Sequence, residues 1–337
     1  MTKYSQYSTA QPAPRWGTLA AVAAGLAAAA LYVNAKARQA EAENPPRGKF
    51  VEVDGVRLHY VDHGTGDALV LLHGNGITAS DFEASSLLDR AGEHQRVIAF
   101  DRPGFGHSER PRTTLWTPEA QARLLHKALK LLGIERPVVV GHSWGTLVAL
   151  AMALDYPDDV RGLVLLSGYY YPSVRLDVPL LSPPAIPVVG DILRHTVTPL
   201  LARALWPLLS KRIFSPAEVP ERFQRLPVWM MLRPSQLRAS AADTALMIPA
   251  AMRLNKRYEE LSVPVQIIAG DSDKIVTPKA HSGRLDDAVA AGTIQMEEGQ
   301  GHMVHYFRVD DILAAIDTVR STPQRGMINA SYVVGHA

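Results

Sequence analysis

The stretch "VVVGHSWGTLVAL", residues 138–150, places a serine between two glycines where one apolar run meets another. The first run is typical of a buried strand and the second of a buried helix. Glycine is needed at 141 and 145 because side chains there would clash as the two elements approach each other. Ser143 is then expected to adopt an unfavourable backbone conformation that points its hydroxyl outward, as on a nucleophile elbow. The alternative is a small residue that only allows close packing.

The signals around this stretch alternate between strand and helix. An antiparallel hairpin is expected around the Asp54-Gly55 turn. Further strands are expected within residues 68–74, 96–101, 137–142, 160–168, 263–273 and 292–302, and helices within 117–134, 144–155, 278–290 and 304–319. This order predicts an α/β fold with a doubly wound, mostly parallel sheet whose site lies at the carboxyl ends of the strands.

The alternation stops between residues 169 and 261, a segment rich in Pro, Leu, Trp and Met. Two strands follow it, so we interpret it as a helical cap inserted into one core formed by 49–168 and 262–320, rather than as a second domain. The cap offers apolar surface for an acyl chain or a lipid-like substrate. Its candidate substrate-binding residues are Trp206, Trp229, Met230 and Met247. The alternative is that these side chains form the cap's own core.

The N-terminus differs in kind from the rest of the chain. Residues 1–16 are polar, 17–33 carry no charge, and 34–48 have the composition of a polar linker. As a helix, 17–33 would span roughly 25 Å, slightly less than a hydrocarbon core of about 30 Å. It is interpreted as a membrane anchor whose side is open, as a signal peptide cleaved before export, or as a soluble Ala-rich helix. Residues 321–337 are expected to form a C-terminal tail.

Composition narrows the chemistry. The chain has 337 residues, a net charge of +2 and no cysteine, so disulfides, thiolate metal sites and a cysteine nucleophile are excluded. The charge balance gives no reason to expect a nucleic-acid partner. The twelve histidines show no metal-binding spacing and no phosphate loop is present, so neither a metal nor a cofactor is predicted.

A serine nucleophile needs a base, and the base needs an orienting acid. His302 follows the last predicted strand, and Asp273 follows the strand before it. In a parallel sheet both loops open at the same edge as Ser143. His305 is the rival base and is expected to face the following helix instead; Asp271 is the rival acid.

A tetrahedral oxyanion also needs hydrogen-bond donors. One is expected to be the backbone N–H of Trp144, at the start of a helix where N–H groups are free. The second is expected from the loop "HGNG", residues 73–76, at the N–H of Asn75. His73 in that loop is interpreted as a brace and not as a catalytic group.

Five motifs together resemble the α/β-hydrolase fold superfamily, in particular its capped branch of esterases and haloperoxidase-like enzymes. They are "HGNG", "DRPGFGHSERP", "GHSWG", "GDSDKIVTP" and "GQGH", spread over residues 50–320. The resemblance implies Ser143 as nucleophile, Asp273 as acid and His302 as base. It also implies Asn75 and Trp144 at the oxyanion hole.

One detail departs from the esterase pattern. The Asn after His-Gly and the Trp after the nucleophile resemble the halide-binding residues of haloalkane dehalogenases, which carry an Asp nucleophile. Position 143 is a serine, and an alkyl ether formed on it would be a dead end. Dehalogenation and epoxide opening are therefore disfavoured.

The sequence thus predicts a serine hydrolase that cleaves a small-molecule carboxylic ester through an acyl-enzyme. The same triad would also serve an amide hydrolase, a C–C hydrolase or an acyltransferase. A ligand-binding protein of the same fold, without turnover, is the alternative from another class.

Overall fold

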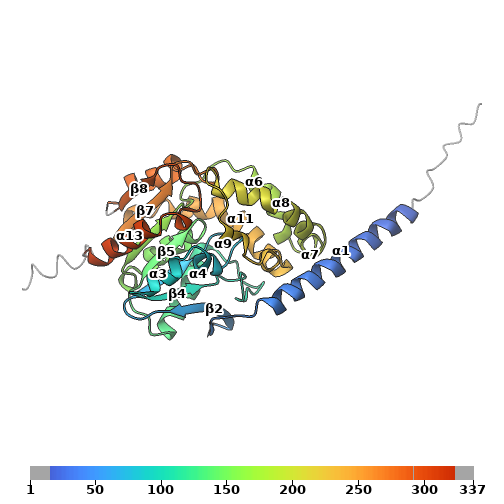
Figure 1. Ribbon diagram of the computed structural model, residues 1–337, viewed down its shortest axis with the longest axis horizontal. Coiled ribbons are helices and arrows are strands. Elements are labelled where there is room, and N and C mark those ends of the chain that lie inside the picture. Colours follow the sequence, from blue (N-terminus) through green and yellow to red (C-terminus); the bar gives the residue numbers. More distant parts are fainter. Residues whose placement is uncertain (1–15, 291, 323–337) are drawn as a thin grey trace, which may run out of the picture.

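The computed structural model describes residues 16–290 and 292–322, and the centre of the molecule is one eight-stranded sheet (Figure 1). Its spatial order is β1-β2-β4-β3-β5-β6-β7-β8. The strands are β1 (Lys49–Val53), β2 (Val56–His63), β3 (Ala68–Leu72), β4 (Arg96–Phe100), β5 (Val138–His142), β6 (Gly162–Leu166), β7 (Val265–Gly270) and β8 (Gly292–Glu297).

The strand directions confirm the predicted fold class. β1 pairs antiparallel with β2, and β2 pairs antiparallel with β4, whereas every pair from β4 to β8 is parallel. The first hairpin turns at Asp54 and Gly55, whose φ values of 50° and 73° fit a two-residue turn that follows the right-handed strand twist. The four central strands are buried apolar runs because helices cover both of their faces.

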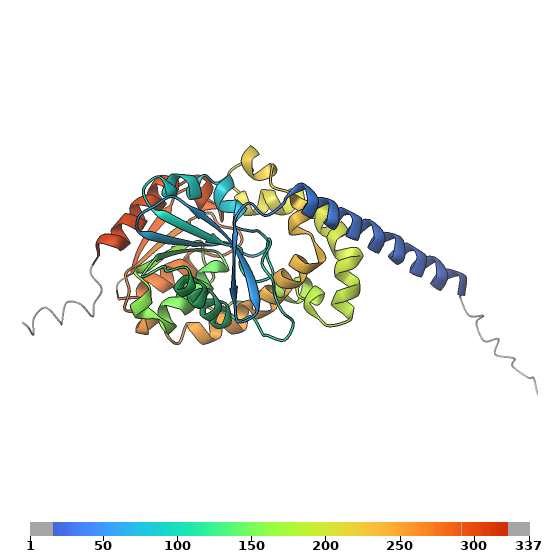
Figure 2. The same ribbon diagram turned by 90° about the horizontal axis from the view of Figure 1, so that it is seen from below.

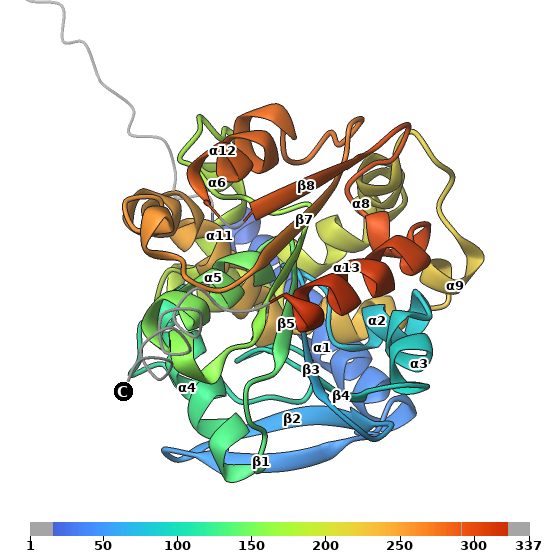
Figure 3. The ribbon, with the colours of Figure 1, turned by 90° about the vertical axis from the view of Figure 1, so that its left-hand side faces the viewer.

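Helices pack on the two faces of this sheet and bury two apolar cores (Figure 3). One face is covered by α4 (Pro118–Leu131), α5 (Gly145–Asp155) and α12 (Arg284–Ala288). The other is covered by α2 (Ser80–Ala84), α3 (Leu87–Gly92) and α13 (Val309–Ser321). The closing helix begins later than predicted, because Val304–Tyr306 form a 3-10 turn that keeps this segment against the site. Thr117 caps α4 by accepting from the Ala120 N–H at 3.2 Å, as its position before Pro118 predicts.

The residues between β6 and β7 form helices and turns and contain no strand. The helices are α6 (Asp177–Leu181), α7 (Val189–His195), α8 (Val197–Phe214), α9 (Glu221–Gln224), α10 (Val228–Met231) and α11 (Pro234–Leu254). We call this insertion the cap. It contacts loops that follow β3, β5 and β8, and so lies over the carboxyl ends of the strands.

The N-terminal helix α1 (Trp16–Glu43) is longer than the predicted apolar segment. The expected linker 34–48 is wrong in its first ten residues, which continue the helix. Their sequence, rich in Ala, Glu, Lys and Gln, favours helix, and Ala37 and Ala40 bury one side against the cap. Within the described residues, α1 is the one helix long and apolar enough to cross a membrane. Residues 1–15 of the predicted polar segment and 323–337 of the predicted tail lie outside the described residues.

Candidate active site

Ser143 occupies the turn between β5 and α5 with a φ of 51°. A non-glycine residue in this left-handed region is strained, and such strain is typical of functional sites. The turn is held tightly: the Ser143 N–H donates to the Leu166 carbonyl at 2.8 Å. A Cβ on Gly145 would lie 2.2 Å from the Leu72 carbonyl oxygen, so no side chain fits there. The close approach inferred from the two glycines is therefore present.

His302 and Asp273 meet as the sequence predicts. His302 Nδ1 lies 2.7 Å from Asp273 Oδ2, and both side chains are almost fully buried. The other carboxylate oxygen of Asp273 accepts the N–H groups of Ile275 and Val276, which fixes its orientation. The rival acid, Asp271, is exposed and accepts instead from the Gly299 N–H at 2.9 Å.

The third contact of the predicted triad is not closed in this structure. Among the described residues no hydrogen bond joins Ser143 to His302. The two are linked through His142, the residue before the serine, whose ring centroid lies 5.1 Å from that of His302. Contacts between nucleophile and base are commonly loose before substrate binds.

The two backbone N–H groups predicted for an oxyanion hole, those of Asn75 and Trp144, have no acceptor among the described residues. Their side chains are anchored on the cap helix α11. The Asn75 amide donates to the Ser240 carbonyl and the Thr244 hydroxyl, and the Trp144 indole donates to the Asp243 carbonyl at 2.9 Å. Both N–H groups are thus free while their residues are held in place.

Asp243 and Arg102 form a buried ion pair next to the loop of residues 73–76. Arg102 Nη1 lies 2.7 Å from Asp243 Oδ2, and both side chains are fully buried. Arg110 contacts the other carboxylate oxygen at 2.9 Å. Arg102 also donates to the carbonyls of His73 and Gly74 and lies over the Trp144 ring. Burial lowers the pKa of Arg102, and the Asp243 carboxylate opposes that effect.

His73 braces the same loop, as inferred from the sequence. Its Nδ1 donates to the Gly74 carbonyl at 2.8 Å, and its Nε2 accepts the Arg102 N–H at 2.9 Å. Burial, and then the charge of Arg102, lower the pKa of His73 to about 3. The imidazole is therefore neutral and positions the backbone.

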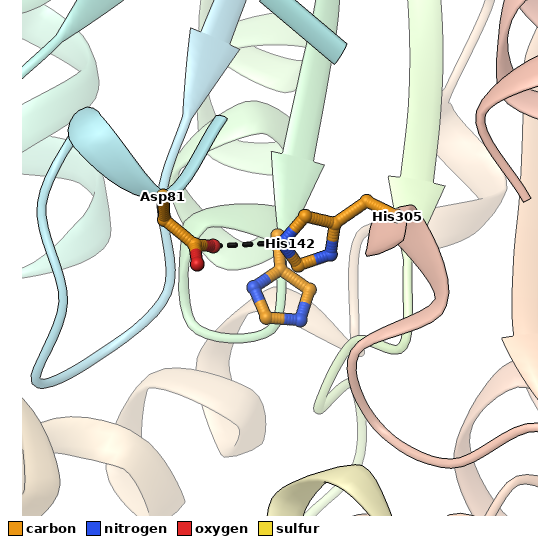
Figure 4. A group of neighbouring side chains, drawn as sticks. All are labelled: Asp81, His142 and His305. Atoms are coloured by element: carbon orange, nitrogen blue, oxygen red, sulfur yellow. Dashed lines mark hydrogen bonds and ion pairs between the residues drawn. The ribbon is translucent and has the colours of Figure 1, made fainter. Parts of the chain in front are cut away.

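Below the serine, Asp81, His142 and His305 converge from α2, β5 and the 3-10 turn after β8 (Figure 4). His305 Nε2 donates to Asp81 Oδ2 at 2.7 Å, and Tyr306 donates to the other oxygen. His142 Nε2 donates to the His302 carbonyl. Burial, followed by the neighbouring His305 and His302, holds the pKa of His142 well below its usual range.

This buried cluster fits a positioning role better than a metal site. One ligand-type atom from each residue lies within 4.8 Å of the others. However, all three side chains are fully buried, and hydrogen bonds already occupy Asp81 and one nitrogen of each histidine. The cluster holds the backbone of His302, and His305 faces Asp81 as a structural partner and not the serine.

The predicted substrate-binding residues are scattered over the cap. Trp206 stacks on Phe223 in a cluster that includes Met303, the neighbour of His302. Trp229 packs edge-on against Tyr32 of α1, with ring centroids 6.0 Å apart. Met230 is buried, and Met247 is half-buried against the central core. Trp206 is therefore the one of the four that shares a cluster with a neighbour of the predicted base.

Sequence reasoning assigned no role to Arg102 or Asp243. Arg102 stands in the quoted "DRPGFGHSERP" motif, directly after a strand, and that position was its signal. Asp243 lies in the middle of a cap helix, about 100 residues from the serine, and nothing local distinguishes it from a surface carboxylate.

A polar surface hollow of about 680 Å³ lies at the opposite edge of the sheet, beside Ala68 and Val138 at the start of β3 and β5, away from the site.

Residues 67–309 match the family model described as the alpha/beta hydrolase fold. The chain belongs to the α/β-hydrolase fold family. Haloalkane dehalogenase 2 of Mycobacterium tuberculosis is 33% identical over 132 residues, which are 39% of this chain and 46% of that protein. The 2-hydroxy-6-oxononadienedioate/2-hydroxy-6-oxononatrienedioate hydrolase of Burkholderia vietnamiensis is 42% identical over 127 residues, 36% and 44% of the two chains. This α/β-hydrolase thus spans less than half the length of these curated relatives.

A crystal structure of a membrane phospholipase A, described as a bacterial virulence factor, has a TM-score of 0.63 to this α/β-hydrolase. The two are 21% identical, and the match covers 91% of this chain and 98% of the other. At this identity the likeness concerns the fold alone.

Replacing Asp243 by Asn should destabilise the protein. The buried Arg102 and Arg110 would lose their shared counter-charge, which typically costs about 3–5 kcal/mol. The free energy of unfolding, measured in urea, should fall accordingly. The control is Glu221→Gln, which removes an exposed pair with Arg225 and should leave the unfolding midpoint unchanged. Equal losses in both variants would contradict the structural importance of the buried pair.

Stability should also fall with acid through the buried histidines. The unfolded chain takes up protons at histidine below about pH 6.5, whereas folded His73 stays neutral down to about pH 3. The free energy of unfolding should therefore be highest above about pH 6.5 and decrease below it, by about 1.4 kcal/mol per pH unit for each such histidine. Urea unfolding at pH 7.5, 6 and 5 measures this slope. His73→Asn should flatten it, and the exposed His94→Asn should not; identical slopes in both variants would refute the assignment.

Proposed function

We propose that the protein is a serine hydrolase of carboxylic esters, with Ser143 as nucleophile, His302 as base and Asp273 as orienting acid. One observation carries the proposal. The 2.7 Å contact between His302 and Asp273 lies at the same sheet edge as a serine held at a φ of 51° between two crowded glycines. Ser86 and Ser167 also have a positive φ, so strain alone does not distinguish Ser143; its place at the same sheet edge as an oriented histidine does.

The proposed mechanism uses these groups in order. His302 removes the Ser143 proton as the oxygen attacks the acyl carbon, and Asp273 stabilises the imidazolium. The N–H groups of Asn75 and Trp144 receive the oxyanion, because they have no other acceptor among the described residues. The alcohol leaves with the proton from His302, and water then repeats the sequence on the acyl-enzyme.

An apolar acyl group is the proposed substrate moiety. Met303 follows the base directly and packs in a cluster with Ile77, Phe214 and Trp206, so apolar side chains flank His302 on the cap side. Arg102 and Arg110 both pair with the Asp243 carboxylate, so neither is available to bind an anionic substrate. We further propose that α1 anchors the enzyme in a membrane, because its first thirteen residues are exposed and uncharged.

The relatives name two other activities, hydrolysis of a 2-hydroxy-6-oxo dienedioate and dehalogenation. Hydrolysis of a 2-hydroxy-6-oxo dienedioate, as named for the Burkholderia relative, would use the same nucleophile and base. Such a dicarboxylate would need cationic partners, which Arg102 and Arg110 do not provide. For the activity named in the dehalogenase relative, Ser143 would form an alkyl ether that water cannot readily cleave, so this activity is not proposed.

Hydrolysis of p-nitrophenyl esters from acetate to palmitate tests the proposal directly. The wild-type chain should turn over several members of the series, and Ser143→Ala should abolish this activity while retaining the fold seen by circular dichroism. A fluorophosphonate probe should label the wild type and not the variant. Absence of both turnover and labelling in the wild type would leave a binding protein as the better account.

A matched pair of carboxylate variants tests the acid. Asp273→Asn removes the partner of His302 and should lower kcat by about 10³–10⁴-fold, since the imidazole loses its tautomer and its counter-charge. Asp271→Asn, two residues earlier and exposed, should leave kcat within a few-fold of the wild type. Steady-state kinetics on the best ester gives both values. A larger loss in Asp271→Asn would exchange the two roles.

A further inference from the structure

The outer surface of the cap is unusually apolar for a face in water. Exposed large apolar side chains gather on α6, α7, α8 and the turns between them, which we call the cap face (residues 174–209). The members of the cap face on or beside α8 are Val197, Leu200, Leu201, Leu205, Leu208 and Leu209, and those before it are Val174, Leu176, Leu180, Leu181, Ile186, Val188, Val189 and Ile192. α7 contacts α8, and both α6 and α7 contact the turn Pro183–Ala185, so these side chains lie on neighbouring elements. Exposed apolar side chains that gather in this way mark interaction sites.

Helix α8 is apolar on its exposed side as well as on its buried side, unlike a helix on a water-exposed surface. Val197, Leu201, Leu205 and Leu208 recur at helical spacing, and they are 40–65% exposed. The buried side of the same helix is also apolar: Phe214 is fully buried, and Trp206 and Ile213 pack in the cluster around it. A helix that buries one apolar side and exposes a second has that second side available to a partner outside the described chain.

The helix α1 identifies that partner. It packs against α7, α8 and α10 with its C-terminal half and then continues past the cap without further contacts (Figure 1, Figure 2). Tyr32 contacts Trp229, Val33 is fully buried, and Asn34 contacts His195. The uncharged segment 17–33 therefore meets the cap in its last turn. A bilayer that holds this segment must lie directly beside the cap face.

The charges of this region match a lipid surface. Residues 174–212 contain five basic and two acidic residues, and α8 ends in Lys211 and Arg212 without any acid of its own. Basic side chains beside an apolar stripe are typical of helices that lie in a membrane interface and contact anionic headgroups. A second copy of the chain on this face would bring Arg203, Lys211 and Arg212 towards their own equivalents, which like charge disfavours.

We propose that the cap face inserts into the bilayer interface next to α1, so that the cap is a membrane-docked element and not a water-exposed lid. The inference rests on the proposed anchoring by α1. Docking of the cap face would also bring the membrane close to the site, because the end of α8 contacts His302. The Ile213 carbonyl at the end of α8 accepts the His302 N–H at 3.2 Å, and a helix is only about 10 Å wide. An ester held in the outer acyl region would reach the site without crossing water.

Single cysteines test this docking in the full-length protein, which contains no natural cysteine. Leu180→Cys, Leu201→Cys and Leu208→Cys place a probe on the cap face. Leu131→Cys on α4 and Met296→Cys on the edge strand β8 are controls at exposed apolar positions outside the cap. Each variant is labelled with an environment-sensitive NBD fluorophore and reconstituted into phosphatidylcholine–phosphatidylglycerol vesicles, with or without lipids that carry a nitroxide on the acyl chain.

The three cap-face probes should shift to shorter emission wavelength and lose at least half of their intensity to the nitroxide lipids. The two controls should be quenched only by aqueous iodide. Iodide quenching of the cap-face probes at the control level would overturn the proposal. Signals that follow the protein-to-lipid ratio would overturn it too, because a second copy would then cover the face.

The same preparations are assayed with p-nitrophenyl acetate, a soluble ester that does not depend on docking. Turnover together with water-exposed cap-face probes would refute the docking and leave the proposed hydrolase intact. Buried cap-face probes without turnover in any preparation would support the docking and refute the proposed hydrolase. Replacing Leu201, Leu205 and Leu208 together by Ser should preserve turnover of the soluble ester and reduce turnover of a vesicle-borne ester at least tenfold.

Discussion

The buried carboxylate of Asp243 is the constraint on which the rest of the site depends. It is fully buried in the middle of α11, and it pairs with Arg102 and Arg110, which follow β4 of the central sheet. Moving the cap away would leave these charges unpaired in a low-dielectric interior, at a cost of several kcal/mol. The cap is therefore fixed to the loop of residues 73–76 at this point, and α11 is not free to move as a lid.

The loops of the site are set by neutral, buried polar groups. His73 braces the chain before Asn75, and His142 holds the carbonyl of His302. Burial disfavours the charged form of each imidazole. Neutral His73 donates through one ring nitrogen and accepts through the other, whereas His142 uses only Nε2. In the proposed mechanism, these contacts would hold the N–H groups of Asn75 and Trp144 in place before substrate binds, so that the oxyanion would be stabilised without reorganising the protein.

The family to which the chain belongs hosts several chemistries on one frame, and the identity of the nucleophile separates them. A serine at 143 supports acyl transfer and argues against a mechanism that must hydrolyse an alkyl link to the enzyme. In the proposed function, the cap would determine which molecules reach the serine. Here one helix, α8, contacts the predicted base on one side and presents leucines outward on the other, which couples substrate supply to the surroundings of the cap.

The sequence by itself determined where the strands lie along the chain, the first hairpin and the tight turn at Ser143, because these follow from local periodicity and turn residues. The spatial order of the strands came only from the structure. The sequence could not reveal Asp243, whose partners lie more than a hundred residues away, nor show that 34–43 continue α1, since that extension is stabilised by burial against the cap. It also could not tell which cap leucines face inward. Only tertiary packing decides that, because burial of a helix face depends on what lies beside it.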